Sequence, residues 1–119
     1  MKREGVRLKL PNGKSAVIEK EKILDYLLNE AHPDNAGKAA FFSGLGFHKD
    51  NWLNLISIFK LIAQTAEVSK SMESPHGWKY VVDGDIEAPE GNISLVRTIW
   101  IIDRGDDKPR LVTAYPRKK

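Results

Sequence analysis

Three histidines could exchange protons near neutral pH: His32, His48 and His76. His32 precedes a proline and lies six residues before Lys38, which follows Gly37. We expect Lys38 near the start of a short helix, where free backbone N–H groups and an ammonium group could bind phosphate beside His32. The same residues also fit a structural interpretation, in which His32 and the proline end a helix and Lys38 faces solvent.

The last apolar stretch of the chain offers a second set of polar groups. If it is a strand, its two faces carry Leu111, Thr113 and Tyr115 on one side, and Arg110, Val112 and Ala114 on the other. With Val112 and Ala114 toward the core, Thr113 and Tyr115 lie on the open face. Their neighbour on the preceding strand is Arg97 or Thr98, depending on register. A hydroxyl, a phenol and a guanidinium together could hold a phosphodiester. A strand of mixed polarity without a ligand is the alternative.

No metal or cofactor site is predicted. The chain has no cysteine, which excludes disulfides, thiolate metal sites and a cysteine nucleophile. It has no His-x-x-x-His pair and no calcium-loop motif. The Asp83-Gly84-Asp85 stretch fits a bend better than a magnesium site. Gly44-Leu45-Gly46 lacks the lysine of a phosphate loop.

Size and composition indicate one globular domain. The chain has 119 residues, of which 41% are hydrophobic and 29% charged, so we expect a single domain over 1–119 with a core at about 6–116. No apolar run approaches the roughly 18 residues that cross a membrane. No secretory signal follows the charged N-terminus, so we expect a cytoplasmic location and no membrane partner.

Basic residues gather at both ends of the chain, although the net charge is only +3. They are Lys2, Arg3, Arg7, Lys9 and Lys14 at one end, and Lys108, Arg110, Arg117, Lys118 and Lys119 at the other. An acidic stretch runs from Asp83 to Glu90 between them. If the two ends meet in space they form a patch that attracts the phosphates of RNA; otherwise they are solvated termini.

The periodicity of the apolar residues predicts an α+β fold. Residues 6–10 and 15–18, joined by Pro11-Asn12-Gly13, fit an N-terminal β-hairpin. Helices are predicted over 21–29, over 36–43 and from about residue 50, the last being apolar on nearly every side and therefore the most buried. Residues 69–76 are expected to form a loop. Strands over 78–87, 93–102 and 110–115, joined by short turns, predict an antiparallel meander with the three helices on one face.

The core should combine the helices with one face of the central strand. We expect it to contain Leu27, Phe41, Trp52, Ile56, Phe59 and Ile62, packed against either Val96 and Trp100 or Leu95 and Ile99.

Several motifs resemble an uncharacterised bacterial domain family over about residues 8–116. They are His32-Pro33 with Gly37-Lys38-Ala39, Phe41-Phe42 and Leu45-Gly46-Phe47; Trp78-Lys79-Tyr80-Val81-Val82; and Val96 to Ile102 with Pro109 to Pro116. Members of that family occur as short stand-alone proteins and as tips of polymorphic toxins.

The order of helices and meander, with a threonine and a tyrosine on the last strand, is similar to the barnase–EndoU–colicin–RelE ribonuclease superfamily, which cleaves RNA without a metal. The resemblance implies that His32 acts as base or acid and that Lys38 and Arg97 hold the phosphate. It also implies that Thr113 and Tyr115 position the RNA or protonate the leaving oxygen. Arg97, Thr98 and Arg110 are the predicted substrate contacts.

The alternative is a protein-binding module without catalysis, such as an antitoxin, an immunity protein or the partner of a neighbouring gene product. Only the enzyme requires His32, Lys38, Thr113 and Tyr115 to converge in one cleft.

Overall fold

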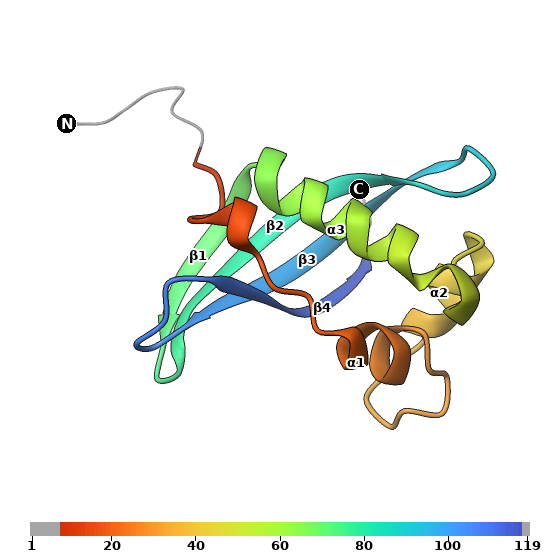
Figure 1. Cartoon of the computed structure of the whole chain (residues 1–119), viewed down its shortest axis with the longest axis horizontal. Helices are drawn as coiled ribbons and strands as arrows, with labels where there is room; N and C mark the ends of the chain where they lie inside the picture. Colours follow the sequence, from red (N-terminus) through yellow and green to blue (C-terminus); the bar gives the residue numbers. More distant parts are fainter. Residues whose placement is uncertain (1–7, 118–119) are drawn as a thin grey trace.

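Three helices precede a four-stranded antiparallel sheet in the computed structural model, which describes residues 8–117 (Figure 1). The helical part comprises the turns η1 (Gly13–Ser15) and η3 (Lys49–Asn51), the helix α1 (Lys20–Lys22) with its continuation η2 (Ile23–Leu27), and the helices α2 (Lys38–Gly44) and α3 (Trp52–Thr65). The strands are β1 (Val68–Ser74), β2 (Gly77–Glu87), β3 (Ile93–Asp103) and β4 (Pro109–Pro116). The predicted α+β class is confirmed. No helix within 8–117 is long and apolar enough to cross a membrane.

The sheet is a meander in the order β1-β2-β3-β4, with every neighbouring pair antiparallel. β2, β3 and β4 match the three predicted strands. β1 covers most of the segment 69–76 that was predicted to be a loop, so that prediction is wrong for residues 69–74 and holds only for the turn at 75–76. β1 lies at the edge of the sheet and most of its side chains are exposed. A strand exposed on both faces has no apolar alternation by which a sequence would reveal it.

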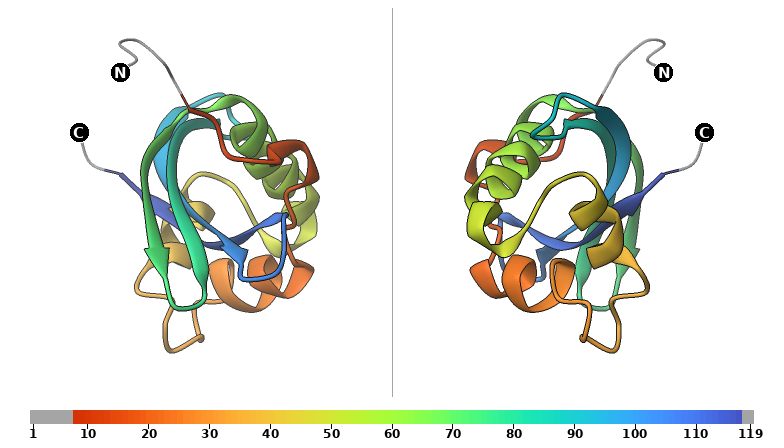
Figure 2. Two further views of the ribbon diagram at one scale, coloured as in Figure 1. Left: turned by 90° about the vertical axis from the view of Figure 1, so that its left-hand side faces the viewer. Right: turned by 90° about the vertical axis from the view of Figure 1, so that its right-hand side faces the viewer.

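α3 lies across one face of the sheet, as the two side views show (Figure 2). Gly84 of β2 permits this close packing, because a Cβ atom there would come within 2.9 Å of the Ile62 side chain. The helical segments η2, α2 and α3 all contribute to a single buried cluster against the sheet. Of the two core arrangements predicted for β3, the structure contains Val96 and Trp100, both fully buried.

The helical side of the core follows the prediction in part. Leu27, Phe59 and Ile62 are buried, whereas Phe41, Trp52 and Ile56 are partly buried against the same cluster. α3 carries apolar residues on nearly every side, as predicted, but only one side of it is buried. Its buried face consists of Leu55, Phe59, Ile62 and Ala63. Leu53 and Leu61 are each 60% exposed, and both point away from the core.

The predicted N-terminal hairpin is not confirmed. Gly13 begins the turn η1 instead of joining two paired strands. Each flank pairs with a different part of the sheet: Lys9 forms an antiparallel bridge with Glu67, and Val17 a parallel bridge with Arg110. Gly13 packs so closely on α3 that a Cβ atom would come within 2.1 Å of the Ala63 carbonyl oxygen, so this glycine serves helix packing. Residues 6 and 7 of the predicted first strand lie outside the described part of the chain.

Candidate functional site

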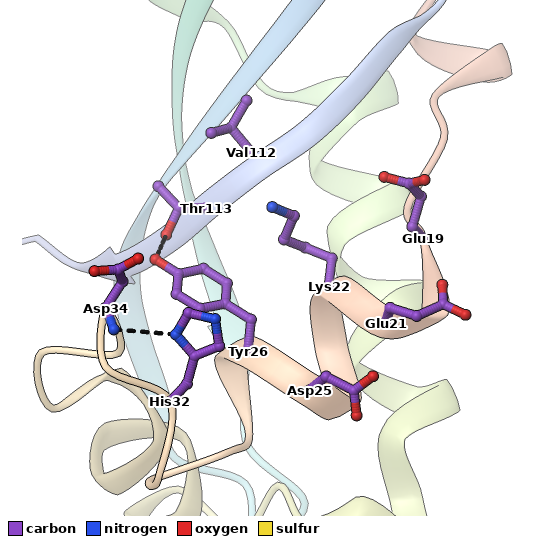
Figure 3. Close-up of a pocket in the computed structure, with 9 residues that line it drawn as sticks. All are labelled: Glu19, Glu21, Lys22, Asp25, Tyr26, His32, Asp34, Val112 and Thr113. Carbon is purple, nitrogen blue, oxygen red and sulfur yellow. Dashed lines mark hydrogen bonds between the residues drawn. The ribbon is translucent and has the colours of Figure 1, made fainter.

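A cleft of about 800 Å³ lies between the first helix and the edge strand β4 (Figure 3). Its walls are formed by Glu19, Glu21, Lys22, Asp25, Tyr26, His32, Asp34, Val112 and Thr113. The helix contributes the first group of these side chains, the loop between η2 and α2 contributes His32 and Asp34, and β4 contributes the last two. Two of the residues predicted to be catalytic, His32 and Thr113, therefore line one cavity.

Tyr26 is the centre of this group. Its hydroxyl lies 3.0 Å from Thr113 Oγ1, within hydrogen-bonding distance. The His32 ring packs edge-on against the Tyr26 ring with centroids 5.0 Å apart, and Lys38 Nζ lies 5.2 Å from the same ring centroid. His32, Lys38 and Thr113, predicted from separate parts of the sequence, thus meet around a tyrosine that the sequence did not single out.

Two local irregularities place Tyr26 opposite Thr113. η2 is a π-helical turn, in which the Leu28 N–H donates to the carbonyl of Ile23, five residues earlier, at 2.9 Å. Such turns are rare and occur frequently at functional sites. β4 carries a bulge: Thr113 pairs with Ile99 but Leu111 pairs with Trp100, which leaves Val112 as an extra residue. Bulges also occur frequently beside active sites, where they redirect a side chain.

The bulge also corrects the predicted faces of the last strand. Leu111 was expected to share a face with Thr113, and Val112 to enter the core. In the structure Leu111 is 1% exposed in the core, while Val112 is half-buried and lines the cleft. One extra residue reverses the alternation of side chains. Ala114 remains buried as predicted, which leaves Thr113 and Tyr115 facing away from the core.

Asn35 fastens the loop of His32 to both helices. Its side-chain amide donates to the carbonyl of Tyr26 at 2.6 Å, and its side-chain oxygen accepts from the Ala39 N–H in α2 at 2.8 Å. Asn35 is 3% exposed, so these hydrogen bonds are shielded from water. This side chain therefore sets the spacing between the tyrosine on η2 and the lysine that begins α2.

The surroundings of Tyr26 favour its ionised form. Burial raises the pKa of Tyr26, but hydrogen bonds with Lys38 and Thr113 and the charges of Lys38 and Lys22 outweigh it, so the pKa lies below 10.0. Lys22 Nζ lies 5.3 Å from the centroid of the Tyr26 ring, so both lysines contact this ring. Within residues 8–117, neither lysine forms an ion pair with a carboxylate.

The hydrogen bonding of His32 defines its neutral tautomer. The Asp34 N–H donates to His32 Nδ1 at 3.0 Å (Figure 3). An Nδ1 that accepts a hydrogen bond carries no proton, so in the neutral ring the proton is assigned to Nε2. His32 therefore presents an N–H donor at Nε2, and further protonation at Nδ1 would break the bond to Asp34.

Carboxylates surround the outer part of the cleft. Glu19, Glu21, Asp25 and Asp34 all line it and all are exposed. Figure 3 shows the carboxylates of Glu21 and Asp25 pointing away from Tyr26. The rim is thus acidic, whereas the interior around Tyr26 is basic.

Tyr115 lies outside this cleft, in a second cluster on β4. Its Cα partner is Arg97, so the register places Arg97, and not Thr98, on the face of Tyr115. Arg97 forms two hydrogen bonds to the carboxylate of Asp83, at 2.8 and 3.0 Å, and Arg117 pairs with the same carboxylate at 3.0 Å. The hydrogen bond to Asp83 raises the pKa of Arg97. Tyr115 follows Thr113 by two residues, or about 7 Å along the strand.

The other two predicted substrate contacts have structural partners. Arg110 forms two hydrogen bonds to the carboxylate of Asp103, at 2.6 and 3.0 Å. Thr98 is fully buried; its hydroxyl donates to the Val82 carbonyl at 2.6 Å and accepts from the Trp100 indole N–H at 2.8 Å. Neither residue reaches the cleft.

The remaining predicted features lie apart from the cleft. His48 precedes η3, and His76 is exposed between β1 and β2. Asn12 donates to the Asp107 carbonyl at 2.6 Å, which joins the loop before η1 to the turn before β4. The outermost basic residues of both ends (1–7, 118 and 119) lie outside the described range. Among the residues that are described, no three His, Asp or Glu side chains are placed to hold a metal ion.

Comparison with known proteins gives a family and a fold. A family model described as Domain of unknown function (DUF6883) matches residues 9–118. No curated protein gives a significant match. Among solved structures, a chain of the "Contact-dependent growth inhibition toxin - immunity protein complex from Klebsiella pneumoniae 342" is similar, with a TM-score of 0.72 and 16% sequence identity. The similarity covers 90% of this chain and 97% of that chain, and at this identity it shows a shared fold.

Proposed function

The chain belongs to the family described as Domain of unknown function (DUF6883), and we propose that it is a metal-independent ribonuclease of the toxin type. The observation that carries the proposal is the convergence of Tyr26, His32 and Thr113 at one cleft, with the Lys38 ammonium beside the Tyr26 ring. RNA as the substrate is supported by the resemblance of the sequence to a ribonuclease superfamily. A role in a toxin system is supported by the shared fold with a chain of a toxin–immunity complex.

The proposed reaction is an internal attack of the RNA 2′-hydroxyl. The 2′-oxygen forms a bond to the neighbouring phosphorus, the bond from phosphorus to the 5′-oxygen breaks, and the products are a 2′,3′-cyclic phosphate and a free 5′-hydroxyl. The reaction needs a base for the 2′-hydroxyl proton, an acid for the leaving oxygen and positive charge beside the phosphate. It needs no activated water.

The residues of the cleft divide these roles by their chemistry. Tyr26, whose pKa is lowered, is the proposed base, which accepts the 2′-hydroxyl proton when its hydroxyl is ionised. His32 acts as the acid in its imidazolium form: a proton taken up at Nδ1 replaces the hydrogen bond from Asp34, and Nε2–H then gives its proton to the leaving 5′-oxygen, which leaves a neutral ring. Lys22 and Lys38 neutralise the phosphate, because neither forms an ion pair with a carboxylate within residues 8–117. Thr113 holds the hydroxyl of Tyr26 in place.

The second cluster on β4 would bind the adjoining nucleotide. Tyr115 is half-buried beside Arg97, about 7 Å from Thr113 along the strand, so an RNA strand that enters the cleft could extend to it. An aromatic ring there could stack on a base. Arg97 is committed to Asp83, so it supports the tyrosine more than it binds the phosphate.

The test is cleavage of RNA by the purified chain in the presence of a chelator. We expect products that end in a 2′,3′-cyclic phosphate, from substrates that include tRNA and ribosome-bound message. His32→Ala and Lys38→Ala should each lower the rate by roughly 10²–10⁴-fold if they act as acid and as phosphate ligand. His76→Ala and Lys70→Ala are matched controls, because both side chains are exposed and distant from the cleft in the fold.

Binding adds a second measurement to this test. Affinity of the His32→Ala variant for a short RNA strand should fall steeply with salt if Lys22 and Lys38 contact phosphate. Absence of chelator-resistant cleavage in every substrate would refute the ribonuclease. Cleavage that survives His32→Ala but not Lys38→Ala would support the ribonuclease reaction and show that His32 is not its general acid.

An immunity-like binding module is the second candidate, and the acidic rim of the cleft favours it. Glu19, Glu21, Asp25 and Asp34 repel a polyanion and suit a basic protein surface. The shared fold with a chain of the toxin–immunity complex supports this candidate better than it supports the ribonuclease. Absence of cleavage, combined with salt-dependent binding of a basic protein that Asp25→Asn weakens, would establish the module in place of the enzyme.

A further inference from the structure

We propose that the free edge of β2 at residues 83–87 binds an extended segment of a partner protein, in which apolar and basic side chains alternate. The proposal concerns the opposite edge of the sheet from the cleft and does not rest on the ribonuclease.

The edge is free because β1 is shorter than β2. β1 pairs with β2 only as far as Val68, which lies opposite Val82. Beyond that point, β2 has β3 on one side and no strand among residues 8–117 on the other. The chain before Val68 turns away into α3, so it does not cover this edge.

The backbone groups of this segment point outward. The Ala88 N–H donates to the Asn92 carbonyl at 2.7 Å, on the β3 side. In an antiparallel ladder successive residues alternate between the two neighbours, so the N–H and C=O groups of Asp85 and Glu87 point away from β3. Unpaired groups of this kind form hydrogen bonds with an added strand.

An apolar groove of about 380 Å³ runs beside this edge, under the C-terminal half of α3. Its apolar lining consists of Ile58, Leu61, Ile62, Ala66 and Ile93, and Thr65, Gly84, Asp85 and Glu87 complete it. Leu61 is 60% exposed and Ile93 is 67% exposed, among the highest values for large apolar side chains in residues 8–117. Exposed apolar residues gathered beside a free strand edge are typical of a protein-binding surface.

The charges at the edge identify the chemistry of the partner. Asp85 and Glu87 flank the fully buried Ile86 along β2, and both also line the groove. Both are exposed, and within residues 8–117 neither forms an ion pair. A strand added here would direct alternate side chains toward α3 and toward these carboxylates, which requires apolar residues in one set and lysine or arginine in the other.

A second copy of this chain fits the edge poorly. Pairing β2 with β2 of another copy would bring the carboxylates of Asp85 and Glu87 together, and like charges on neighbouring strands are destabilising. The charge therefore favours a different, basic partner.

The test uses synthetic peptides with the full-length chain. The probe is a fluorescein-labelled peptide that alternates valine and lysine, compared with a peptide of valine and glutamate and with a valine–lysine peptide N-methylated at alternate backbone amides. We expect the first to bind and both comparison peptides to bind at least roughly tenfold more weakly, because one lacks the charge and the other the backbone donors. Binding should slow hydrogen exchange at the amides of Asp85 and Glu87.

Variants locate the binding on the molecule. Leu61→Ser should weaken the valine–lysine peptide roughly tenfold, and Asp85→Asn with Glu87→Gln should remove most of its salt dependence. Leu53→Ser is the matched control, because Leu53 is equally exposed on α3 but does not line the groove. Equal binding of the N-methylated peptide, equal effects of Leu53→Ser and Leu61→Ser, or self-association of the chain that Leu61→Ser abolishes would each overturn the proposal.

Discussion

Thr98 was predicted as a candidate substrate contact, but it lies in the core. A substitution of Thr98 should therefore change the stability of the fold and leave RNA cleavage unchanged. Its side chain is fully buried, donates to the Val82 carbonyl at 2.6 Å and accepts from the Trp100 indole at 2.8 Å. Thr98→Val replaces the hydroxyl with a methyl group of similar size, so it leaves no cavity. The substitution removes the only acceptor that the described residues offer to the Trp100 indole N–H.

The cost follows from these two hydrogen bonds. A buried donor left without an acceptor costs about 1–3 kcal/mol, and the loss of the second bond costs about 0.5–1.5 kcal/mol. We therefore expect Thr98→Val to lower the free energy of unfolding by about 2–4 kcal/mol. Thr98→Ser keeps the hydroxyl and loses one methyl group, so it should cost only about 1 kcal/mol.

Urea denaturation of the variants, alone and combined with Trp100→Phe, measures both quantities. Without the indole no donor is stranded, so in the Trp100→Phe background Thr98→Val should cost about 1–3 kcal/mol less. RNA cleavage per folded molecule should not change. An equal cost in both backgrounds would refute the indole argument. Loss of cleavage with unchanged stability would indicate that Thr98 contacts the substrate after all.

Three further predictions concern the core, the site and the charge pairs. Phe59→Ala removes a fully buried ring between α3 and the sheet and should cost roughly 3–5 kcal/mol in urea denaturation; under about 1 kcal/mol would mean that α3 is not central. If Tyr26 is the base, the cleavage rate should rise as pH rises through the lowered pKa of Tyr26, and Tyr26→Phe should abolish this rise. Lys38→Met removes a positive charge that lowers the pKa, so it should move the rise in rate to higher pH; a pH profile that Lys38→Met leaves unchanged would contradict the assignment. The hydrogen bond from Arg110 lowers the pKa of Asp103 below 3.8, so the ion pair stabilises the fold above that pH, and this contribution is lost as pH falls further. Asp103→Asn should therefore lower the free energy of unfolding at neutral pH and change it little in strong acid. An equal loss of stability at both pH values would exclude the ion pair as the cause.

Periodicity predicted the parts of the fold that bury one face. β2, β3 and β4 each present buried side chains to the core, and the alternation of these side chains revealed the strands. β1 has no buried residue, so nothing in its sequence distinguishes it from a loop. The N-terminal segment has a hairpin pattern, but Gly13 is required for contact with α3, and tertiary packing decided its conformation. Local signals therefore predicted elements with a core face and missed those held by long-range pairing.

The candidate site followed a similar division. His32 and Lys38 could be proposed because they stand in a short motif, and Thr113 because it alternates with core residues. Tyr26 could not, because its importance depends on a π-helical turn that places its hydroxyl at Thr113 across 87 positions of sequence. Asn35 is a buried amide in a polar loop, and no sequence pattern indicates its hydrogen bonds to Tyr26 and Ala39. A register shift of one residue in β4 was likewise invisible to strict alternation.

The irregularities of the molecule gather where the chemistry is proposed. The π-helical turn and the bulge each sacrifice regular hydrogen bonding, and the two meet at one contact, between Tyr26 and Thr113. Departures from regular geometry that converge in this way are expected at functional sites more than in structural cores. The cleft lies at the β4 edge of the sheet and the proposed partner surface at the β2 edge, with β3 between them. A partner held at β2 would therefore leave the cleft open, so a protein that blocks cleavage must reach the acidic rim at Glu19 and Asp34 as well.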